Sequence, residues 1–413
     1  MRIEGTFVIV GASLTGAKAA EVLRLEGFGG RIVLIGEEPE RPYERPPLSK
    51  DYLRGEVGPE KAYVHDERFY GEHEIELRTS TRAVAIDPGN AQVVLQDFTR
   101  LRYDRLLLAT GAVPRRLSIP GSDLPGVHYL RTLVDSESLR QAITPASRVV
   151  VVGAGWIGSE VAASARQIGA EVVLIERGAL PLERVVGPEV GAVYRDLHTS
   201  HGVEFLSTTG IEAIDGARSV KAVRTSTGRR IACDVVVIGV GAAPRVELAE
   251  AAGIHVEDGI AVNERLETSV PGVFAAGDVA AAWHPFYQAR IRVEHWANAL
   301  HQGEVAARNM LGLATPYERL PYFFSDQYDL GMEYSGYAPT WDKVVFRGDP
   351  QAGQFIAFWL SDRRVVAAMN ANVWDVTGSI GELIRSRMPI DASLLADPDV
   401  PLEELVGTPQ PER

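Results

Sequence analysis

The chain has 413 residues, of which 46% are hydrophobic, and its formal net charge is −13. This length predicts two or three domains with sizeable buried cores. The negative charge argues against non-specific binding to nucleic acid or to an anionic membrane surface. The sequence contains no run of about 18 apolar residues, so no transmembrane helix is expected. Because the sequence enters an apolar strand without a signal-type segment, we expect a soluble cytoplasmic protein.

The first expected unit is a strand, a glycine-rich turn and a helix start in residues 7–16, FVIVGASLTG. Gly11 permits a tight turn, Ser13 stands where a pyrophosphate approaches the backbone, and Gly16 allows the helix to pack close to the strand. Glu37 ends the next strand, and its distance in sequence from Gly11 is close to that expected of a ribose ligand. Alone, this pattern also fits a strand–helix turn in another kind of α/β protein.

The same pattern returns in residues 149–158, VVVVGAGWIG. Gly153, Gly155 and Gly158 take the three glycine positions, and Glu176 ends the following strand at a similar distance from Gly153. Two such motifs with matching acids predict that the protein binds two adenine nucleotides at once. The usual purpose of such an arrangement is hydride transfer from a nicotinamide to a flavin.

A second internal echo supports a duplication. Residues 106–115 read LLLATGAVPR and residues 235–245 read VVVIGVGAAPR. The sequence offset from Gly111 to Gly241 is similar to the offset from Gly11 to Gly153. We therefore expect two similar nucleotide-binding domains, one inserted in the other.

Two further segments carry candidate functional residues. In PGVFAAGDVAAA, residues 271–282, Asp278 follows a short buried strand and would either accept a hydrogen bond from a ribityl hydroxyl or cap a following helix. Cys233 is the single cysteine, which excludes an internal disulfide, a redox-active disulfide and a metal site built on cysteine pairs. Its position before an apolar strand favours a core residue over a catalytic one.

The character of the sequence changes after about residue 320. Antiparallel strands are predicted at residues 343–347, 354–360 and 365–371, and a helix is expected near residues 378–388. These elements together indicate an α+β domain. The tail TPQPER, residues 408–413, is expected to be disordered.

The predicted fold class is α/β, with two Rossmann-like domains and a C-terminal α+β domain. The expected boundaries are residues 1–116 and 242–320 for an FAD-binding domain, 117–241 for an NAD-binding domain, and 321–413 for the C-terminal domain. No metal site is expected.

Several longer motifs are more specific than the glycine-rich turns. They are Tyr43–Lys50 (YERPPLSK) followed by Tyr52-Leu53, then YLRTL at 129–133, AGD at 276–278, VEHWANA at 293–299 and SDQY at 325–328. With these motifs the chain resembles, over essentially its whole length, the FAD- and NADH-dependent ferredoxin reductases that serve oxygenases, of the putidaredoxin reductase and biphenyl dioxygenase reductase type. Apoptosis-inducing factor and rubredoxin reductase are more distant members. The resemblance implies a glutathione-reductase-like architecture and an oxidoreductase with FAD and NADH as cofactors.

The resemblance also implies site residues. Those expected on the FAD side are Gly11, Ser13, Leu14, Thr15, Gly16, Glu37, Arg45, Lys50, Ala83, Thr110, Gly111, Arg131, Gly277, Asp278, Glu294, His295 and Trp296. Those expected on the nicotinamide side are Gly153, Gly155, Trp156, Ile157, Gly158, Glu160, Glu176 and Gly241. The helix that starts near Glu294–Trp296 is expected to point its N-terminus at the pyrimidine end of the flavin, where reduced flavin carries negative charge.

Two positions depart from the family pattern. Ser13 replaces the usual middle glycine of the FAD turn, and Phe324 stands where the family commonly has Trp before Ser-Asp. A phenylalanine can still stack on a flat ring.

Three functional expectations follow from these residues. Lys50 and Glu160 are expected to form the catalytic ion pair near the flavin N5, the alternative being two solvated charges. Glu176 predicts a preference for NADH over NADPH, which Arg177 would weaken. The acceptor is expected to be an acidic two-iron ferredoxin.

That ferredoxin would dock on a local basic patch, for which the candidates are Arg290, Arg292, Arg385 and Arg387. The alternative is that these are dispersed surface arginines.

The open alternatives to a ferredoxin reductase are of three kinds. Rubredoxin could replace ferredoxin as the acceptor, and the chain could be a non-catalytic NADH-sensing flavoprotein resembling apoptosis-inducing factor. A disulfide or peroxide reductase is disfavoured because the loop PERPYERPPLSK after the first acid contains no cysteine.

Overall fold

The computed structural model describes residues 5–406, so the tail TPQPER lies outside the described residues. The chain divides into two compact units. Unit 1 combines the residues up to Pro46 with Gly58–Val113 and Ala242–Arg319, and unit 2 combines Pro47–Val57 with Pro114–Gly241 and the residues from Leu320 onward.

Unit 1 is organised around a five-stranded parallel sheet. Its strands, in spatial order, are β20 (Val273–Ala275), β7 (Arg105–Leu108), β1 (Thr6–Val10), β2 (Arg31–Ile35) and β3 (Ile75–Arg78). The central strands are continuous apolar runs because helices and loops cover both faces of a parallel sheet. Their side chains form the core of this unit, with Val8, Ile9 and Leu107 fully buried.

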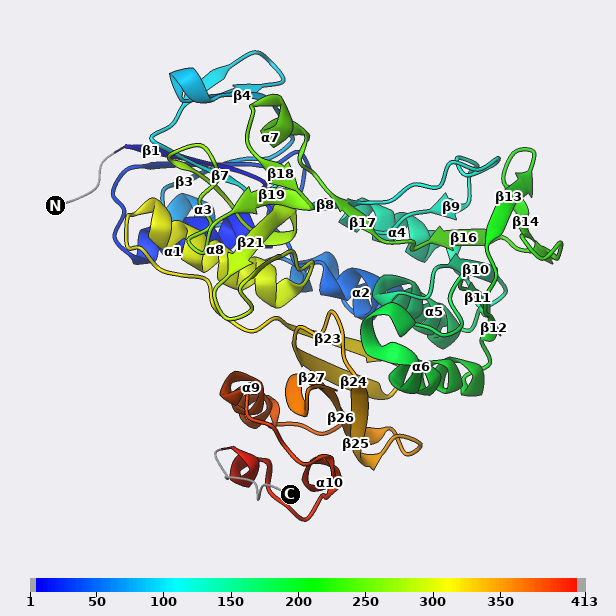
Figure 1. The fold of residues 1–413 in the computed structure, drawn as a ribbon. Coiled ribbons are helices and arrows are strands. Elements are labelled where there is room, and N and C mark those ends of the chain that lie inside the picture. Colours follow the sequence, from blue (N-terminus) through cyan, green and yellow to red (C-terminus); the bar gives the residue numbers. More distant parts are fainter. Residues whose placement is uncertain (1–4, 407–413) are drawn as a thin grey trace. The chain divides into compact units, whose positions relative to one another are not determined.

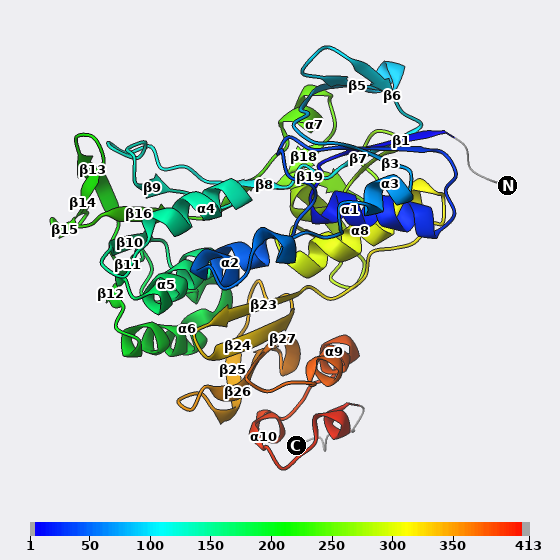
Figure 2. The ribbon, with the colours of Figure 1, turned by 180° about the vertical axis from the view of Figure 1, so that it is seen from behind.

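Two helices of unit 1 lie side by side in both views, α1 (Leu14–Leu25) and α8 (Trp296–Met310) (Figures 1 and 2). Their close approach depends on Gly303, where a Cβ would lie 2.6 Å from the backbone oxygen of Thr15. The α8 helix is thereby held against the first turn of α1.

Smaller elements complete unit 1. They are α3 (Phe69–Glu72), the antiparallel β4 (Ala83–Asp87), β5 (Gln92–Leu95) and β6 (Arg100–Arg102), then β17 (Ala242–Pro244), α7 (Glu247–Ala251), β18 (Val256–Glu257), β19 (Gly259–Val262), the 3-10 turn η4 (Gly277–Val279), β21 (Ala280–His284) and β22 (Ala289–Ile291). The chain passes from unit 1 to unit 2 within β8 (Ala112–Pro114).

Unit 2 contains a second five-stranded parallel sheet. Its strands, in spatial order, are β12 (Glu204–Leu206), β11 (Glu171–Ile175), β10 (Arg148–Val152), β16 (Val235–Ile238) and β9 (Val127–His128). In the first sheet, β1 precedes the glycine-rich turn and lies between β2 and β7. In the second sheet, β10 precedes the glycine-rich turn and lies between β11 and β16 in the same way. The predicted duplication is therefore confirmed.

Helices and a three-stranded sheet surround the parallel strands of unit 2. They are α2 (Asp51–Arg54), α4 (Leu133–Ala142), α5 (Trp156–Ile168), α6 (Glu183–Ser200) and the sheet of β13 (Ile211–Gly216), β14 (Val220–Thr225) and β15 (Arg230–Ala232). Helix α4 begins with a capping box, in which Thr132 and Asp135 satisfy each other's backbone N–H groups.

The C-terminal part of unit 2 is an antiparallel sheet. Its strands, in spatial order, are β23 (Tyr322–Gln327), β24 (Leu330–Gly336), β27 (Arg364–Ala371), β26 (Gln354–Ser361) and β25 (Lys343–Asp349), followed by α9 (Thr377–Ser386), α10 (Ala392–Ala396) and the 3-10 turn η5 (Leu402–Leu405). The three predicted strands and the predicted helix are confirmed. Trp359, fully buried in β26, donates from its indole N–H to the Val186 carbonyl on α6 at 3.1 Å.

No helix among residues 5–406 is both long and apolar enough to cross a membrane.

Candidate functional site

The first glycine-rich turn, between β1 and α1, is a cradle that side chains would fill. Gly11 has a φ of +124°, and a Cβ there would lie 2.0 Å from the Ala109 backbone oxygen. A Cβ on Gly16 would lie 2.0 Å from the Gly11 backbone oxygen. Leu14 and Thr15 begin helix α1 directly after this turn. The N–H groups at a helix N-terminus suit an anionic pyrophosphate, so these residues fit a dinucleotide.

The second turn, between β10 and α5, repeats this geometry. Gly153 has a φ of +97° and a Cβ there would lie 2.4 Å from the Gly239 backbone oxygen, while a Cβ on Gly158 would lie 1.9 Å from the Gly153 backbone oxygen. Trp156 and Ile157 form the first turn of α5. Both turns therefore need glycine at their first and third positions.

Unlike the first and third positions, the middle position of each turn does not require glycine. A Cβ added at Gly155 would meet no atom within 4 Å. Ser13, at the same place in the first turn, is the N-cap of α1 with an extended φ of −123°. Neither backbone requires glycine there, which explains how the first turn accommodates its departure from the family pattern.

The acids after the second strands are held in different ways. The Glu176 carboxylate accepts hydrogen bonds from the backbone N–H of Ala154 at 2.7 Å and of Gly178 at 2.9 Å. The Glu37 carboxylate instead pairs with Arg245 at 2.7 Å and with Arg82 at 3.7 Å, and its side chain is 44% exposed. Glu176 is thus fixed by two backbone N–H groups, one of them from its own glycine-rich turn, whereas Glu37 is fixed by arginine side chains.

Further predicted FAD residues gather near the first turn of α1. A Cβ on Gly277 would lie 2.4 Å from Thr15 Oγ1, and the Gly277 N–H donates to Gln302 Oε1 at 2.8 Å. Asp278 follows in η4 and is succeeded by strand β21, so the alternative that Asp278 caps a following helix is wrong.

Four more predicted FAD residues of unit 1 are held by contacts or by burial within that unit. Arg45 pairs with Glu38 at 2.9 Å, and Thr110 Oγ1 donates to the Arg245 carbonyl at 2.7 Å. The Gly111 carbonyl accepts from the Arg245 N–H at 2.9 Å, and Ala83 is a buried residue at the start of β4.

The N-terminus of α8 begins where the sequence predicts it. His295 is the N-cap and Trp296 the first helical residue, while Glu294 pairs with Arg292. Burial lowers the pKa of His295 to about 4, against an opposing effect of Asp278. The imidazole is therefore neutral near neutral pH, and the positive end of this helix comes from its backbone N–H groups.

Lys50 and Arg131 are the two predicted FAD-side residues in unit 2. The Arg131 N–H donates to Asp135 Oδ2 at 3.1 Å, beside the capping box of α4. Gly241, predicted on the nicotinamide side, accepts at its carbonyl from the Arg115 N–H at 2.9 Å.

The predicted ion pair between Lys50 and Glu160 is confirmed. Lys50 Nζ lies 3.1 Å from Glu160 Oε1, and the two side chains are only 9% and 5% exposed. The alternative of two solvated charges is therefore wrong. A buried pair is stable only when further hydrogen bonds satisfy the remaining polar atoms.

Two serines supply those hydrogen bonds. Ser49 Oγ donates to Glu160 Oε2 at 2.5 Å, and Ser325 Oγ donates to Glu160 Oε1 at 2.7 Å. Both serines lie in the family motifs, directly beside Lys50 and Phe324. Their spacing in the sequence does not reveal that both bind the Glu160 carboxylate. Phe324 itself lies with its ring centroid 5.4 Å from Lys50 Nζ, in cation–π range.

Cys233 is not placed for redox chemistry. Its thiol is 3% exposed within the hydrophobic core of unit 2, and burial raises its pKa to about 12. A neutral buried thiol is a poor nucleophile. Among residues 5–406, no group of three or more His, Cys, Asp or Glu side chains is placed to hold a metal ion.

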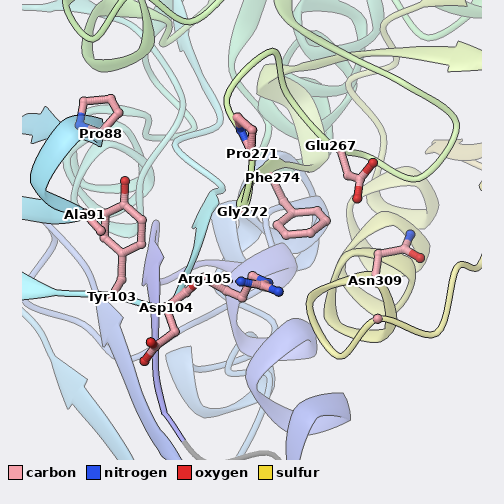
Figure 3. A pocket seen from close by; sticks show the side chains of 11 residues that line it. Pro88, Ala91, Tyr103, Asp104, Arg105, Glu267, Pro271, Gly272, Phe274 and Asn309 are labelled. Atoms are coloured by element: carbon pink, nitrogen blue, oxygen red, sulfur yellow. Dashed lines mark hydrogen bonds between the residues drawn. The ribbon is translucent and has the colours of Figure 1, made fainter.

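The pocket of about 350 Å³ in Figure 3 lies elsewhere in unit 1. Its lining includes Asp104, Arg105, Gly272 and Phe274. Asp104 and Gly272 directly precede β7 and β20, at the amino-terminal ends of these strands, whereas the glycine-rich turn follows the carboxyl end of β1. Ligands of open α/β sheets bind at the carboxyl ends of the strands, so this pocket is not the nucleotide site.

Two arginines of the predicted docking patch form ion pairs with acids of unit 1. Arg290 donates to the Val262 carbonyl and pairs with Glu257 at 3.2 Å. Arg292 is 11% exposed and pairs with Asp258 at 3.3 Å and with Glu294. Both guanidinium groups are therefore paired with neighbouring acids, and their part in the docking patch stays a prediction.

Comparison with known proteins identifies the family. Residues 5–303 match the pyridine nucleotide-disulphide oxidoreductase family, and residues 322–406 match the reductase C-terminal family. The chain belongs to the pyridine nucleotide-disulphide oxidoreductase family. The predicted oxidoreductase class, the α/β fold and the cofactor pair of FAD and NADH are thereby confirmed.

Individual members of this family are similar over the whole chain. Putidaredoxin reductase of Pseudomonas putida is 37% identical over 100% of this chain and 99% of its own length. The ferredoxin–NAD(+) reductase component of the anthranilate 1,2-dioxygenase system of Burkholderia cepacia is 40% identical over 96% of this chain and 98% of its own. The reductase in the covalent putidaredoxin reductase–putidaredoxin complex matches with a TM-score of 0.94 and 37% identity, covering 97% of this chain and 98% of that one. The predicted resemblance is confirmed.

Proposed function

We propose that this oxidoreductase passes electrons from NADH through FAD to a two-iron ferredoxin that serves a monooxygenase or a Rieske dioxygenase. The observation that carries the proposal is the buried Lys50–Glu160 pair, because Glu160 lies on the same helix α5 whose N-terminus forms the second glycine-rich turn. A disulfide or peroxide reductase would need a redox cysteine, and the single thiol of this chain is buried and protonated. The similar proteins named above support the class of acceptor.

The proposed division of labour follows the two glycine-rich turns. FAD is assigned to residues 1–116 and 242–320, NADH to residues 117–241, and a supporting role to residues 321–413. The cofactor residues are those expected from the sequence, including Lys50 and Arg131 on the FAD side although both belong to unit 2.

FAD, when bound, supplies the ability to accept two electrons together and to release them singly. Glu160 pairs with the Lys50 ammonium and orients it within a nearly buried site. The N-terminus of α8 offers partial positive charge from backbone N–H groups, which suits the negative charge of a reduced flavin. Glu176 presents a fixed carboxylate that would accept hydrogen bonds from ribose hydroxyls and repel a 2′-phosphate.

The test is an anaerobic reduction of the purified, FAD-loaded protein by NADH, followed by mixing with a two-iron ferredoxin. The proposal predicts rapid ferredoxin reduction and only slow oxygen consumption in air. Rubredoxin in place of ferredoxin tests the runner-up acceptor. A protein that binds NADH but reduces neither acceptor would instead be the non-catalytic sensor, and the proposal would be rejected.

We further propose a cytoplasmic location.

A further inference from the structure

The Lys50–Glu160 pair is the inner end of a longer chain of hydrogen-bonded side chains, all within unit 2. Ser325 Oγ, which donates to Glu160, accepts from Gln327 Nε2 at 3.3 Å. Gln327 Oε1 in turn accepts from His198 Nε2 at 3.0 Å. Ser325, Gln327 and His198 are 2%, 1% and 0% exposed, so water does not compete for these contacts.

The outer end of the chain is closed by an aromatic stack. The Tyr328 hydroxyl lies 3.3 Å from His198 Nδ1, and the ring of the exposed His201 stacks on Tyr328 with centroids 3.8 Å apart. Helix α6 and the residue that follows it supply the two histidines, while strand β23 and its following turn supply the serine, the glutamine and the tyrosine.

The donors of this chain all point toward Glu160. A neutral imidazole has one N–H, and here it is placed at Nε2, because Nε2 faces Gln327 Oε1, which can only accept. Nδ1 is then left to accept from the Tyr328 hydroxyl, and the NH2 of the Gln327 amide is left to donate to Ser325. Since Ser325 already accepts from Gln327, its own proton is directed to the Glu160 carboxylate. Hydrogen bonds aligned in one direction strengthen each other.

We propose that His198 and Gln327 are positioning residues that act through Ser325 to hold the Glu160 carboxylate oriented toward Lys50. This inference rests on the proposed function for its catalytic consequence. Burial also lowers the pKa of His198 to about 4, with the Gln327 hydrogen bond opposing and His201 adding to that shift, so the imidazole is neutral near neutral pH.

The catalytic test uses Gln327→Leu, Ser325→Ala and the double variant in the FAD-loaded protein. We expect Gln327→Leu to slow flavin reduction by NADH about tenfold, the scale of one hydrogen bond in a network ending on a charge, with the KM for NADH little changed. In the Ser325→Ala background, Gln327→Leu should add no further loss. An unchanged rate for Gln327→Leu, or additive losses in the double variant, would overturn the proposal.

The matched control is Tyr322→Phe on the same strand β23. It removes a hydrogen bond to Glu333 at 2.7 Å without touching the chain that ends on Glu160, and it should leave the reduction rate unchanged. A loss as large as that of Gln327→Leu would show that any weakening of β23 slows the reaction, which contradicts a positioning role.

A second measurement does not depend on activity. Nitrogen-15 NMR of histidine-labelled protein should show His198 neutral with its proton on Nε2 near neutral pH, assigned by its loss in His198→Phe. A proton on Nδ1, or a charged ring, would overturn the inference. If NADH fails to reduce the flavin of the unaltered protein, the proposed function fails, while the tautomer still decides the chain of hydrogen bonds.

Discussion

The two glycine-rich turns share one backbone plan but differ at the seventh residue after the first glycine. In the first turn this residue is Lys18, which is 20% exposed and pairs with Glu21 at 3.1 Å on the same helix. In the second it is Glu160, which is 5% exposed and pairs with Lys50 from a distant segment. The duplicated scaffold therefore repeats the turns that we propose bind nucleotide, whereas the proposed chemistry depends on a position at which the two copies differ.

The acids that follow show a second difference. Glu176 accepts two backbone N–H groups and is fixed before any ribose binds, while Glu37 is 44% exposed and depends on two arginines. A matching spacing in sequence thus yields one preorganised carboxylate and one that pairs with other side chains.

The largest expected effect separates Glu160 from Lys18. Glu160→Ala leaves a buried ammonium without its partner, which should lower the free energy of unfolding by about 3–5 kcal/mol. The control Lys18→Ala removes a more exposed pair and should cost about 1 kcal/mol or less. Denaturant unfolding measures both. Glu160→Ala should also slow flavin reduction more than it weakens FAD retention. Equal losses of stability for the two variants would contradict the contrast between the turns.

The next prediction compares positions within one turn. Gly158→Ala places a methyl group 1.9 Å from a backbone oxygen and should destabilise unit 2 by about 1–3 kcal/mol while weakening NADH binding. Gly155→Ala meets no atom within 4 Å and should change the stability by no more than about 0.5 kcal/mol. Thermal unfolding and NADH titration distinguish them. Equal stability and equal NADH affinity of the two variants would show that the third position of the turn does not require glycine.

A smaller effect is expected for the two acids. Glu176→Ala should lower kcat/KM for NADH about tenfold, since a hydrogen bond to a charged group is lost, and should narrow the preference over NADPH. Glu37→Ala should weaken FAD retention and leave the choice of nicotinamide unchanged. Steady-state kinetics with both nucleotides provide the measurement. Equal or better use of NADPH by the unaltered protein would remove the assignment of Glu176.

The smallest expected effect concerns arginines of the two units. Ferredoxin reduction should slow as salt rises, because screening weakens steering of an acidic partner. Charge reversal at the exposed Arg385 and Arg387 should raise the KM for ferredoxin and leave the KM for NADH nearly unchanged. Reversal at Arg290 and Arg292 should instead lower the melting temperature, since both pair with acids of unit 1. Salt-independent reduction would show that the acceptor is not an acidic ferredoxin.

The sequence was sufficient for the parts that repeat. Apolar strands, glycine spacing and acidic strand ends predicted both parallel sheets and the duplication, because local geometry dictates those residue types. Motif matching predicted the Lys50–Glu160 pair. The strands β23 and β24 were not predicted, since their alternation is interrupted by polar residues that contact Glu160 or one another.

Other features could not be read from the sequence because they depend on tertiary packing. Ser49 and Ser325 lie far apart in the chain, yet both converge on one carboxylate. The pairing of Arg290 and Arg292 with nearby acids was missed because an arginine in a strand or next to one looks the same in sequence whether it is exposed or paired.

An anaerobic double-mixing experiment follows the electrons from NADH through the flavin to the ferredoxin. The FAD-loaded protein is first mixed with NADH and then with a two-iron ferredoxin, while flavin and ferredoxin absorbance are followed together. We expect rapid flavin reduction, followed by flavin reoxidation that matches ferredoxin reduction at two ferredoxins per flavin. Glu160→Gln should slow only the first step. Flavin that stays reduced when ferredoxin is added, or an unchanged first step in Glu160→Gln, would contradict these expectations.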